Sequence, residues 1–358
     1  MPKALAGILF ALSAAALNGS IGIISKLLMA SGLNPYEIAF YKTFLAFVFV
    51  SLLLIRTPFT RKIQIVAPVS DNNIKIWMHI GLCALFGIFT LFFFETIAYG
   101  HGSAANVVVI LMASATIAAL VFGCLLLNEK IKISAVSGVA VAIAGISVIS
   151  WSGQASLLLL IFASAAGAGY GLFSVLVKKF GLHGGIYLTR FLLLFGLIYL
   201  AIPYLATFRQ NPFDFHWQTV TGLIALAILP TILGFYCTTK ALGYLSAAQV
   251  QVTELAEPIF AMLMGWLILS ELPDYAFFLG ALLIITGIML INDVLGLLKT
   301  YFLKEQRLAK GNHSFVSYHI FNQKICNADT LTENTLFIIP LLIYFLLMFY
   351  TIHFYLSP

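Results

Sequence analysis

The apolar stretch GVAVAIAGISVIS at residues 138–150 returns in altered form as GALLIITGIMLIN at residues 280–292. The turn GSAANV at 102–107 likewise returns as LSAAQV at 245–250. The two pairs recur at offsets of 142 and 143 residues. Recurrence at a nearly constant offset predicts an internal duplication, so we expect the fold to consist of two copies of one apolar unit.

The composition places this duplicated unit in a membrane. Of the 358 residues, 61% are hydrophobic and 9% are charged, whereas soluble domains carry about 25% charged residues. The formal net charge of +6 comes from basic residues in short loops beside apolar spans, which favours the positive-inside rule over nucleic-acid binding. The N-terminal apolar run is too long for a cleavable signal peptide. We expect a multi-pass protein of a cell membrane, such as a bacterial inner membrane.

A helix needs about 20 apolar residues to cross the hydrocarbon core of a bilayer. Basic residues fall in alternate loops between such segments, which predicts a cytoplasmic N-terminus. The ten expected spans are 4–30, 35–55, 76–99, 103–127, 133–151, 156–178, 185–207, 219–243, 247–269 and 275–295.

Each half of the chain, residues 1–151 and 152–295, contains five of these spans. Because five is odd, the second copy must lie upside down relative to the first. The expected fold is therefore an all-α integral membrane bundle of ten helices in two inverted five-helix repeats. Inverted repeats are typical of secondary transporters, whose halves rock around a central site. A duplicated scaffold that transports nothing is the alternative.

The chain continues beyond the second repeat. Residues 296–335 are polar and are expected to form a cytoplasmic linker. The apolar run 336–356 is long enough to span a bilayer, so we expect an extra C-terminal transmembrane helix within 336–358. A peripheral helix without a role in transport is the main interpretation, with contact to a partner or a homodimer as the alternative.

Two acidic residues lie inside an apolar span, in VTELAEPIFA at 252–261. Carboxylates within hydrocarbon are costly and indicate function. Glu254 and Glu257 are three residues apart and so share one helix face. Desolvation and like charge both oppose ionisation, so one of them could hold an exchangeable proton near neutral pH. Pro258 cannot donate a backbone hydrogen bond to the Glu254 carbonyl, which predicts a kink.

The buried acids do not follow the symmetry of the repeat. At the repeat offset Glu257 matches Ala115, and Glu95 in the third span matches Thr238. Chemistry commonly breaks a rule that the scaffold would otherwise keep. We expect Glu254 to bind substrate or a proton, while direct contact and a structural role remain open for Glu257 and Glu95. An internal ion pair that merely locks helices is the alternative for all three.

Other polar residues in the spans are weaker candidates, for which packing is the alternative. Lys42 and Arg190 match across the repeat near the starts of their spans. Both are possible counter-ions of the buried acids, and this match favours a structural or snorkelling role for them over that of a ligand for the substrate. The further candidates for substrate or proton binding are Gln251, Asn18, Tyr170 and Tyr236.

The ordered set of motifs resembles the drug/metabolite transporter superfamily, EamA type. The resemblance covers residues 1 to about 295 and rests on the two five-span repeats, the SAA turns and AEPIFA at 256–261. It also rests on the glutamates near the ends of LLLNEKI and LILSEL, Glu129 and Glu271. It implies secondary transport by alternating access, with the Glu257–Pro258 pair recurring whatever the substrate.

The chemistry of the candidate residues suggests a cargo. Carboxylates and hydroxyls in a cavity can meet an ammonium group, so we expect proton-coupled export of an amino acid or related zwitterion. Uptake or exchange of a nucleotide-related metabolite is the alternative within transport, and a membrane scaffold or sensor is the alternative outside it. The sequence has no Walker motif, metal-ligand spacing or activated nucleophile, so we expect no enzyme activity, cofactor or metal. The expected partners are the substrate, protons and lipid, and no nucleic acid.

Overall fold

The computed structural model describes most of the two repeats. The described residues are 3–55, 73–102, 104–129, 133–150, 156–182, 184–207, 216–261, 263 and 275–292. The predicted linker at 296–335 and the predicted extra helix at 336–358 lie outside them. Throughout the described ranges the regular structure is helical, as the sequence predicts.

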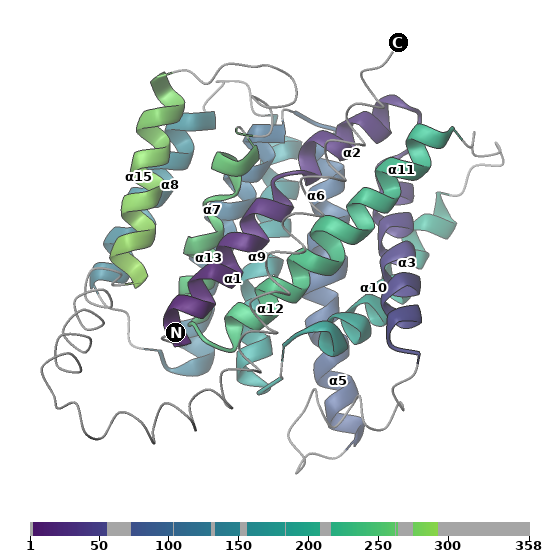
Figure 1. Ribbon diagram of the computed structural model, residues 1–358, viewed down its shortest axis with the longest axis horizontal. Helices are drawn as coiled ribbons and strands as arrows, with labels where there is room; N and C mark the ends of the chain where they lie inside the picture. The colour runs from purple at the N-terminus through teal and green to yellow at the C-terminus, as the bar shows by residue number, and fades with distance from the viewer. Residues whose placement is uncertain are drawn as a thin grey trace, which may run out of the picture.

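Within these ranges, seven helices are long and apolar enough to cross a membrane. Two shorter apolar helices, Ile133–Val148 and Phe278–Asn292, lie where the fifth and tenth spans are expected. The helices, shown in Figure 1, are α1 (Lys3–Asn18), α2 (Ile21–Ala30), α3 (Pro35–Leu53), α5 (Asn73–Ala84), α6 (Leu91–Tyr99), α7 (Ala104–Leu127), α8 (Ile133–Ser150), α9 (Leu157–Lys179), α10 (Ile186–Ala206), α11 (Trp217–Leu226), α12 (Phe235–Leu242), α13 (Ala247–Glu254) and α15 (Tyr275–Asn292).

Several helices begin at polar residues that cap their free backbone N–H groups. Asn34 accepts a hydrogen bond from the backbone N–H of Glu37, whose side chain bonds back to Asn34, and Pro35 follows at the first helical position. Ser246 and Gln249 form the same reciprocal arrangement at the start of α13. These capping boxes fix where α3 and α13 begin.

The two repeats pack through equivalent helices. The second and seventh spans, α3 and α10, lie against each other, as do α7 with α13 and α8 with α15; the last pair stands at the left of Figure 1. The first and sixth spans cross over, because α1 packs on α12 and α13 while α9 packs on α6 and α7. Each repeat therefore inserts its first helix into the other.

Glycines allow the closest of these approaches. A Cβ atom at Gly167 of α9 would overlap the Leu111 carbonyl of α7, and one at Gly171 would overlap the Ala115 carbonyl. The same principle joins α8 to α15, where a Cβ at Gly145 would meet the Gly280 carbonyl at 2.6 Å. Small residues let membrane helices pack backbone against backbone, where van der Waals contact replaces the hydrophobic effect.

Several spans are interrupted near their middle. The first changes from α1 to α2 at Gly19 and Ser20, and the ninth leaves helical geometry at Leu255 and Ala256. The third and eighth contain π-helical segments, η1 (Leu85–Thr90) and η2 (Ala227–Gly234). Segments of this kind are frequent at functional sites.

The two π-helical segments are counterparts in the repeat. GLCALFGIFT at 81–90 aligns with GLIALAILPT at 222–231 at an offset of 141, but TIAYG at 96–100 aligns with TKALG at 239–243 at 143. The second copy thus carries two extra residues, and η2 has eight residues against six in η1. Thr90 and Thr231 each donate a side-chain hydrogen bond to the carbonyl five residues earlier. The insertion is absorbed by extending the π-helical segment.

We expect Gly171→Ala to destabilise the bundle by about 1–3 kcal/mol, the usual cost of overpacking a close interface. The matched control is Gly81→Ala in α5, where the nearest atom to the new Cβ is the movable Tyr199 hydroxyl at 3.3 Å. Thermal unfolding of both proteins in lipid nanodiscs would measure the difference. Equal unfolding temperatures would contradict the close packing of α7 on α9.

Candidate functional site

The interrupted spans surround one buried cavity. Asn18 and Ile21 reach it from the break in the first span, Glu257 from the break in the ninth, and Pro230 and Thr231 from η2. The remaining lining residues are Lys42, Leu91, Phe92, Glu95, Leu111, Met112, Tyr170 and Phe235. The space open to the centre of a water molecule is about 20 Å³, enough for about one water. This conformation is closed around the site.

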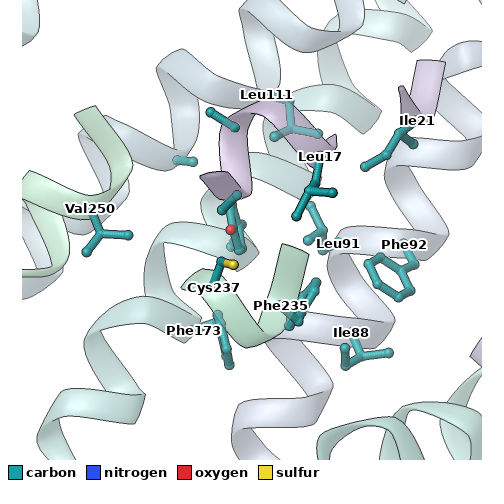
Figure 2. Packing of buried hydrophobic residues seen from close by; sticks show 14 of the residues in the cluster. Leu17, Ile21, Ile88, Leu91, Phe92, Leu111, Phe173, Phe235, Cys237 and Val250 are labelled. Carbon is teal, nitrogen blue, oxygen red and sulfur yellow. The ribbon is translucent and has the colours of Figure 1, made fainter. Parts of the chain in front are cut away.

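Apolar side chains from many helices enclose this region. Figure 2 shows Leu17 of α1, Leu111 of α7, Phe173 of α9 and Phe235 of α12 converging from different sides. Phe92 meets the Phe235 ring edge-on, with the centroids 5.4 Å apart. Such packing excludes water and strengthens every electrostatic interaction within the enclosure.

A buried ion pair forms part of the cavity wall. Lys42 Nζ lies 3.8 Å from Glu95 Oε2, and the two side chains are only 1% and 5% exposed. Tyr99 donates a hydrogen bond to Glu95 Oε1 at 3.3 Å. The Lys42 ammonium also sits 4.0 Å from the centre of the Phe92 ring, a cation–π contact. Lys42 therefore points into the bundle as the counter-ion of Glu95, and the alternative of snorkelling towards a membrane surface is wrong.

Glu257 is the second acid of the cavity. It begins the helical stretch that follows the break in the ninth span and is 2% exposed. Its Oε2 atom is buried without a hydrogen-bond partner among the described residues. An unsatisfied buried carboxylate oxygen costs free energy and calls for an explanation, such as a ligand that binds there.

The kink predicted at Pro258 is confirmed. Helix α13 ends at Glu254, and helical geometry begins again at Glu257 after two non-helical residues. The backbone N–H of Ile259 then donates to the Ala256 carbonyl at 3.0 Å. Because Pro258 has no N–H, the chain cannot form the bond that would carry the helix past Glu254. The break orients the two glutamates into different surroundings.

Glu254 lies outside the lining of the cavity, in a closed cluster of hydroxyl groups. The Thr238 hydroxyl donates to Oε1 at 2.6 Å, and the Tyr170 hydroxyl lies 2.8 Å from Oε2. Those two hydroxyl oxygens are 3.1 Å apart. Glu254 and Thr238 are fully buried and Tyr170 is 2% exposed. Tyr170 also lines the cavity, so it belongs to both the cavity wall and the hydroxyl cluster.

The other predicted residues are distributed around this centre. Gln251 is buried and donates to Ser174 Oγ at 2.9 Å, so it ties α13 to α9. Tyr236 packs edge-on against Phe10 with 6.2 Å between ring centroids. Arg190 donates from Nε to Ser51 Oγ at 3.1 Å, linking α10 to α3. Of the wider candidates, Asn18 and Tyr170 reach the cavity.

Thr238 is the functional residue that the sequence did not single out. It carries a signal, because it occupies the repeat position of Glu95. The first repeat has the Glu95 carboxylate at this position. The second has the Thr238 hydroxyl, which donates a hydrogen bond to Glu254 of the ninth span. The π-helical segments were also not predicted. The two-residue insertion in the second repeat is a sequence signal for the longer one, η2.

The cavity combines a basic group, a paired acid and an acid with an unsatisfied oxygen. Both signs of charge within one enclosure suit a ligand that itself carries both signs. In the described part of the chain, no three His, Cys, Asp or Glu side chains gather closely enough to hold a metal ion. The arrangement offers recognition by charge and hydrogen bonding.

Known proteins share this architecture. A sequence model of the EamA-like transporter family matches residues 5–151 and 156–293. An uncharacterized transporter of Archaeoglobus fulgidus is 27% identical over 270 residues, which is 72% of this chain and 88% of the relative. The uncharacterized transporter YetK of Bacillus subtilis is 26% identical over 174 residues, 46% of this chain and 52% of the relative. A solved structure titled "Crystal structure of protein" superposes with a TM-score of 0.63 at 18% identity, covering 80% of this chain and 96% of its own, and this likeness shows the fold alone.

The ion pair in the cavity wall predicts strong coupling between two substitutions. Lys42→Met leaves the Glu95 carboxylate buried without its counter-ion, so we expect a loss of about 3–5 kcal/mol in unfolding free energy. The double variant Lys42→Met/Glu95→Met removes both charges and should recover most of that loss. Thermal unfolding of the four proteins in one lipid composition measures the coupling. Additive effects of the two single changes would contradict the ion pair.

Proposed function

The chain belongs to the EamA-like transporter family, and on that premise we propose that this membrane transporter exports an amino acid or related zwitterion in exchange for protons. The family match covers both repeats, from residue 5 to 293 with one short gap. The proposal concerns the cargo, the direction and the coupling ion, which the family alone leaves open. No ATP-binding motif occurs in the sequence, which favours secondary transport.

The observation that carries the proposal is the buried, unpartnered Oε2 of Glu257 at the cavity. An ammonium group placed there would supply the missing hydrogen-bond donor and a compensating charge. Charge-assisted hydrogen bonds of this kind are about twice as strong as neutral ones. Glu257 thus supports recognition of an amine.

The ion pair supports recognition of the other end of a zwitterion. Lys42 is 3.8 Å from Glu95, longer than a strong charge-assisted hydrogen bond of about 2.7–2.9 Å. A substrate carboxylate could therefore compete for the Lys42 ammonium. Phe92 and Phe235 would then contact the apolar part of the ligand between its two charged groups.

Transport requires that the cavity open in turn to each side. Its room for about one water, 20 Å³, is far too small for an amino acid. The structure thus represents a closed conformer, and the spans must move apart to admit cargo. The breaks at Gly19–Ser20 and Leu255–Ala256 and the segments η1 and η2 are natural hinge positions, because their backbone is already free of regular α-helical bonding.

The nucleotide-related alternative finds less support in the lining of the cavity. Phosphate groups call for several basic side chains or helix N-termini at one place. Among the lining residues Lys42 is the basic one, and it faces Glu95. The balance of charge favours an amine-bearing cargo.

We expect Glu257→Gln to reduce amino-acid flux by about 10–100-fold. The reason is the loss of one charge-assisted hydrogen bond to the substrate amine, which is worth roughly 1.5–3 kcal/mol. The assay is counterflow in proteoliposomes with an imposed pH gradient and a pool of labelled amino acids. Glu37→Gln is the matched control, because Glu37 serves the capping box of α3, where Gln works equally well.

The same assay separates the parts of the proposal. Flux of amino acids in wild type and Glu37→Gln, with loss in Glu257→Gln, supports an amine site. Selective movement of nucleotides from a parallel labelled pool would replace the cargo class. Flux of amino acids that ignores the pH gradient would remove proton coupling and leave the cargo assignment intact.

A further inference from the structure

Three oxygen-bearing groups from three helices form a closed triangle beside the cavity. Glu254 is the last residue of α13, Thr238 lies in the middle of α12, and Tyr170 lies in α9. The three contacts are 2.6, 2.8 and 3.1 Å, all within hydrogen-bonding range for hydroxyl oxygens or close to it. We call these residues the Glu254 triangle.

The number of hydrogens in the triangle depends on the state of Glu254. When the carboxylate is ionised, the only hydrogens are those of the Tyr170 and Thr238 hydroxyls, so two hydrogens must serve three contacts. One pair of oxygens then meets lone pair to lone pair. When the carboxyl is protonated, three hydrogens serve three contacts, and each group donates once and accepts once. The neutral acid is therefore the state in which all three contacts of the ring carry a hydrogen.

The surroundings of the triangle point the same way. Glu254 is 0% exposed, and an ionised carboxylate in such a place needs a cation. The ionisable side chains that approach are Tyr170 on α9, Cys237 on α12 and Glu257 after the break, and each is neutral or acidic. The lysines of α9 and α12, Lys178, Lys179 and Lys240, stand in the last turns of those helices, and the Lys178 ammonium donates to the Leu242 and Leu245 carbonyls. Of the other helices packed on α13, α7 and α15 have Cys124 and Tyr275 in their end turns, α1 has Lys3 at its start, and α8 has no ionisable residue.

We propose that the Glu254 triangle is a dedicated proton site, distinct from the cavity where Glu257 and Glu95 meet the substrate. The proton resides on Glu254 in the closed conformer and is shared around the ring with Tyr170 and Thr238. The existence of the site follows from the geometry alone. Its use in coupling rests on the proposed transport function.

The triangle is placed where a proton could alter the shape of the site. Thr238 follows η2 by four residues, Glu254 precedes the break in the ninth span, and Tyr170 lines the cavity. Loss of the proton leaves one of the three contacts without a hydrogen and places a charge among three helices. A buried charge without a cation is costly, so ionisation of Glu254 favours a conformer in which water reaches the three helices.

Infrared difference spectroscopy on the full-length protein in lipid nanodiscs tests the proton site without any substrate. The wild type should show the C=O stretch of a protonated buried carboxyl near neutral pH. This band should vanish in Glu254→Gln and persist in Glu257→Gln. Thr238→Val and Tyr170→Phe each remove one of the two hydrogen bonds of the Glu254 carboxyl, so both should move the band to higher frequency. Thr238→Ser keeps the hydroxyl and should leave the band in place.

Each result decides the matter. A wild type without the band near neutral pH overturns the proposal, as does a band that survives Glu254→Gln and disappears in Glu257→Gln. A band that disappears in Glu254→Gln but does not shift in Thr238→Val shows a protonated acid without the ring and also overturns it. Because the assay measures no transport, its outcome is independent of whether an amino acid is the cargo.

Discussion

The constraint on which this structure depends is that hydrocarbon offers no water to a free backbone N–H or C=O group. A membrane helix that breaks must therefore place the break where protein or a cavity can receive it. Here the breaks of the first and ninth spans and the π-helical segment of the eighth border one enclosure, and the π-helical segment of the third ends directly before Leu91, which lines it. The irregular backbone and the buried charges thus share the same protected interior.

Duplication of one five-span unit produces this arrangement of spans, and sequence divergence between the two copies gives the site its polar side chains. The crossing of α1 and α9 into the opposite repeats brings the interrupted spans together. A strictly symmetric bundle would offer the same side chains twice. Instead the first repeat supplies Lys42 and Glu95, while the second supplies Thr238, Glu254 and Glu257. The polar side chains of the site are therefore arranged asymmetrically.

The sequence predicted the features that depend on local pattern. The all-α membrane fold and the kink at Pro258 follow from hydropathy, recurrence at a fixed offset and the missing N–H of proline. The candidate residues included every ionisable side chain of the cavity and the acid of the triangle. What local pattern could not supply was which side chains meet.

Side-chain contacts between different spans could not be predicted from the sequence, because they depend on how helices distant in sequence pack against each other. Glu254 and Tyr170 are 84 residues apart, and Lys42 and Glu95 lie on different spans. The sequence places Glu254 and Glu257 on one helix face, with Glu254 expected to bind substrate or a proton and Glu257 either in direct contact or structural. In the folded chain the break after α13 separates them, and their environments diverge.

That divergence supports the proposed separation of the substrate site from the proton site. A single carboxylate that served both substrate and proton would bind them in competition, and each would exclude the other. Glu257 has a free oxygen at the cavity, whereas both oxygens of Glu254 are engaged by hydroxyl groups. Tyr170 belongs to both environments, because its hydroxyl completes the triangle and it also lines the cavity. Tyr170 is thus a direct link between the proposed substrate site and the proposed proton site.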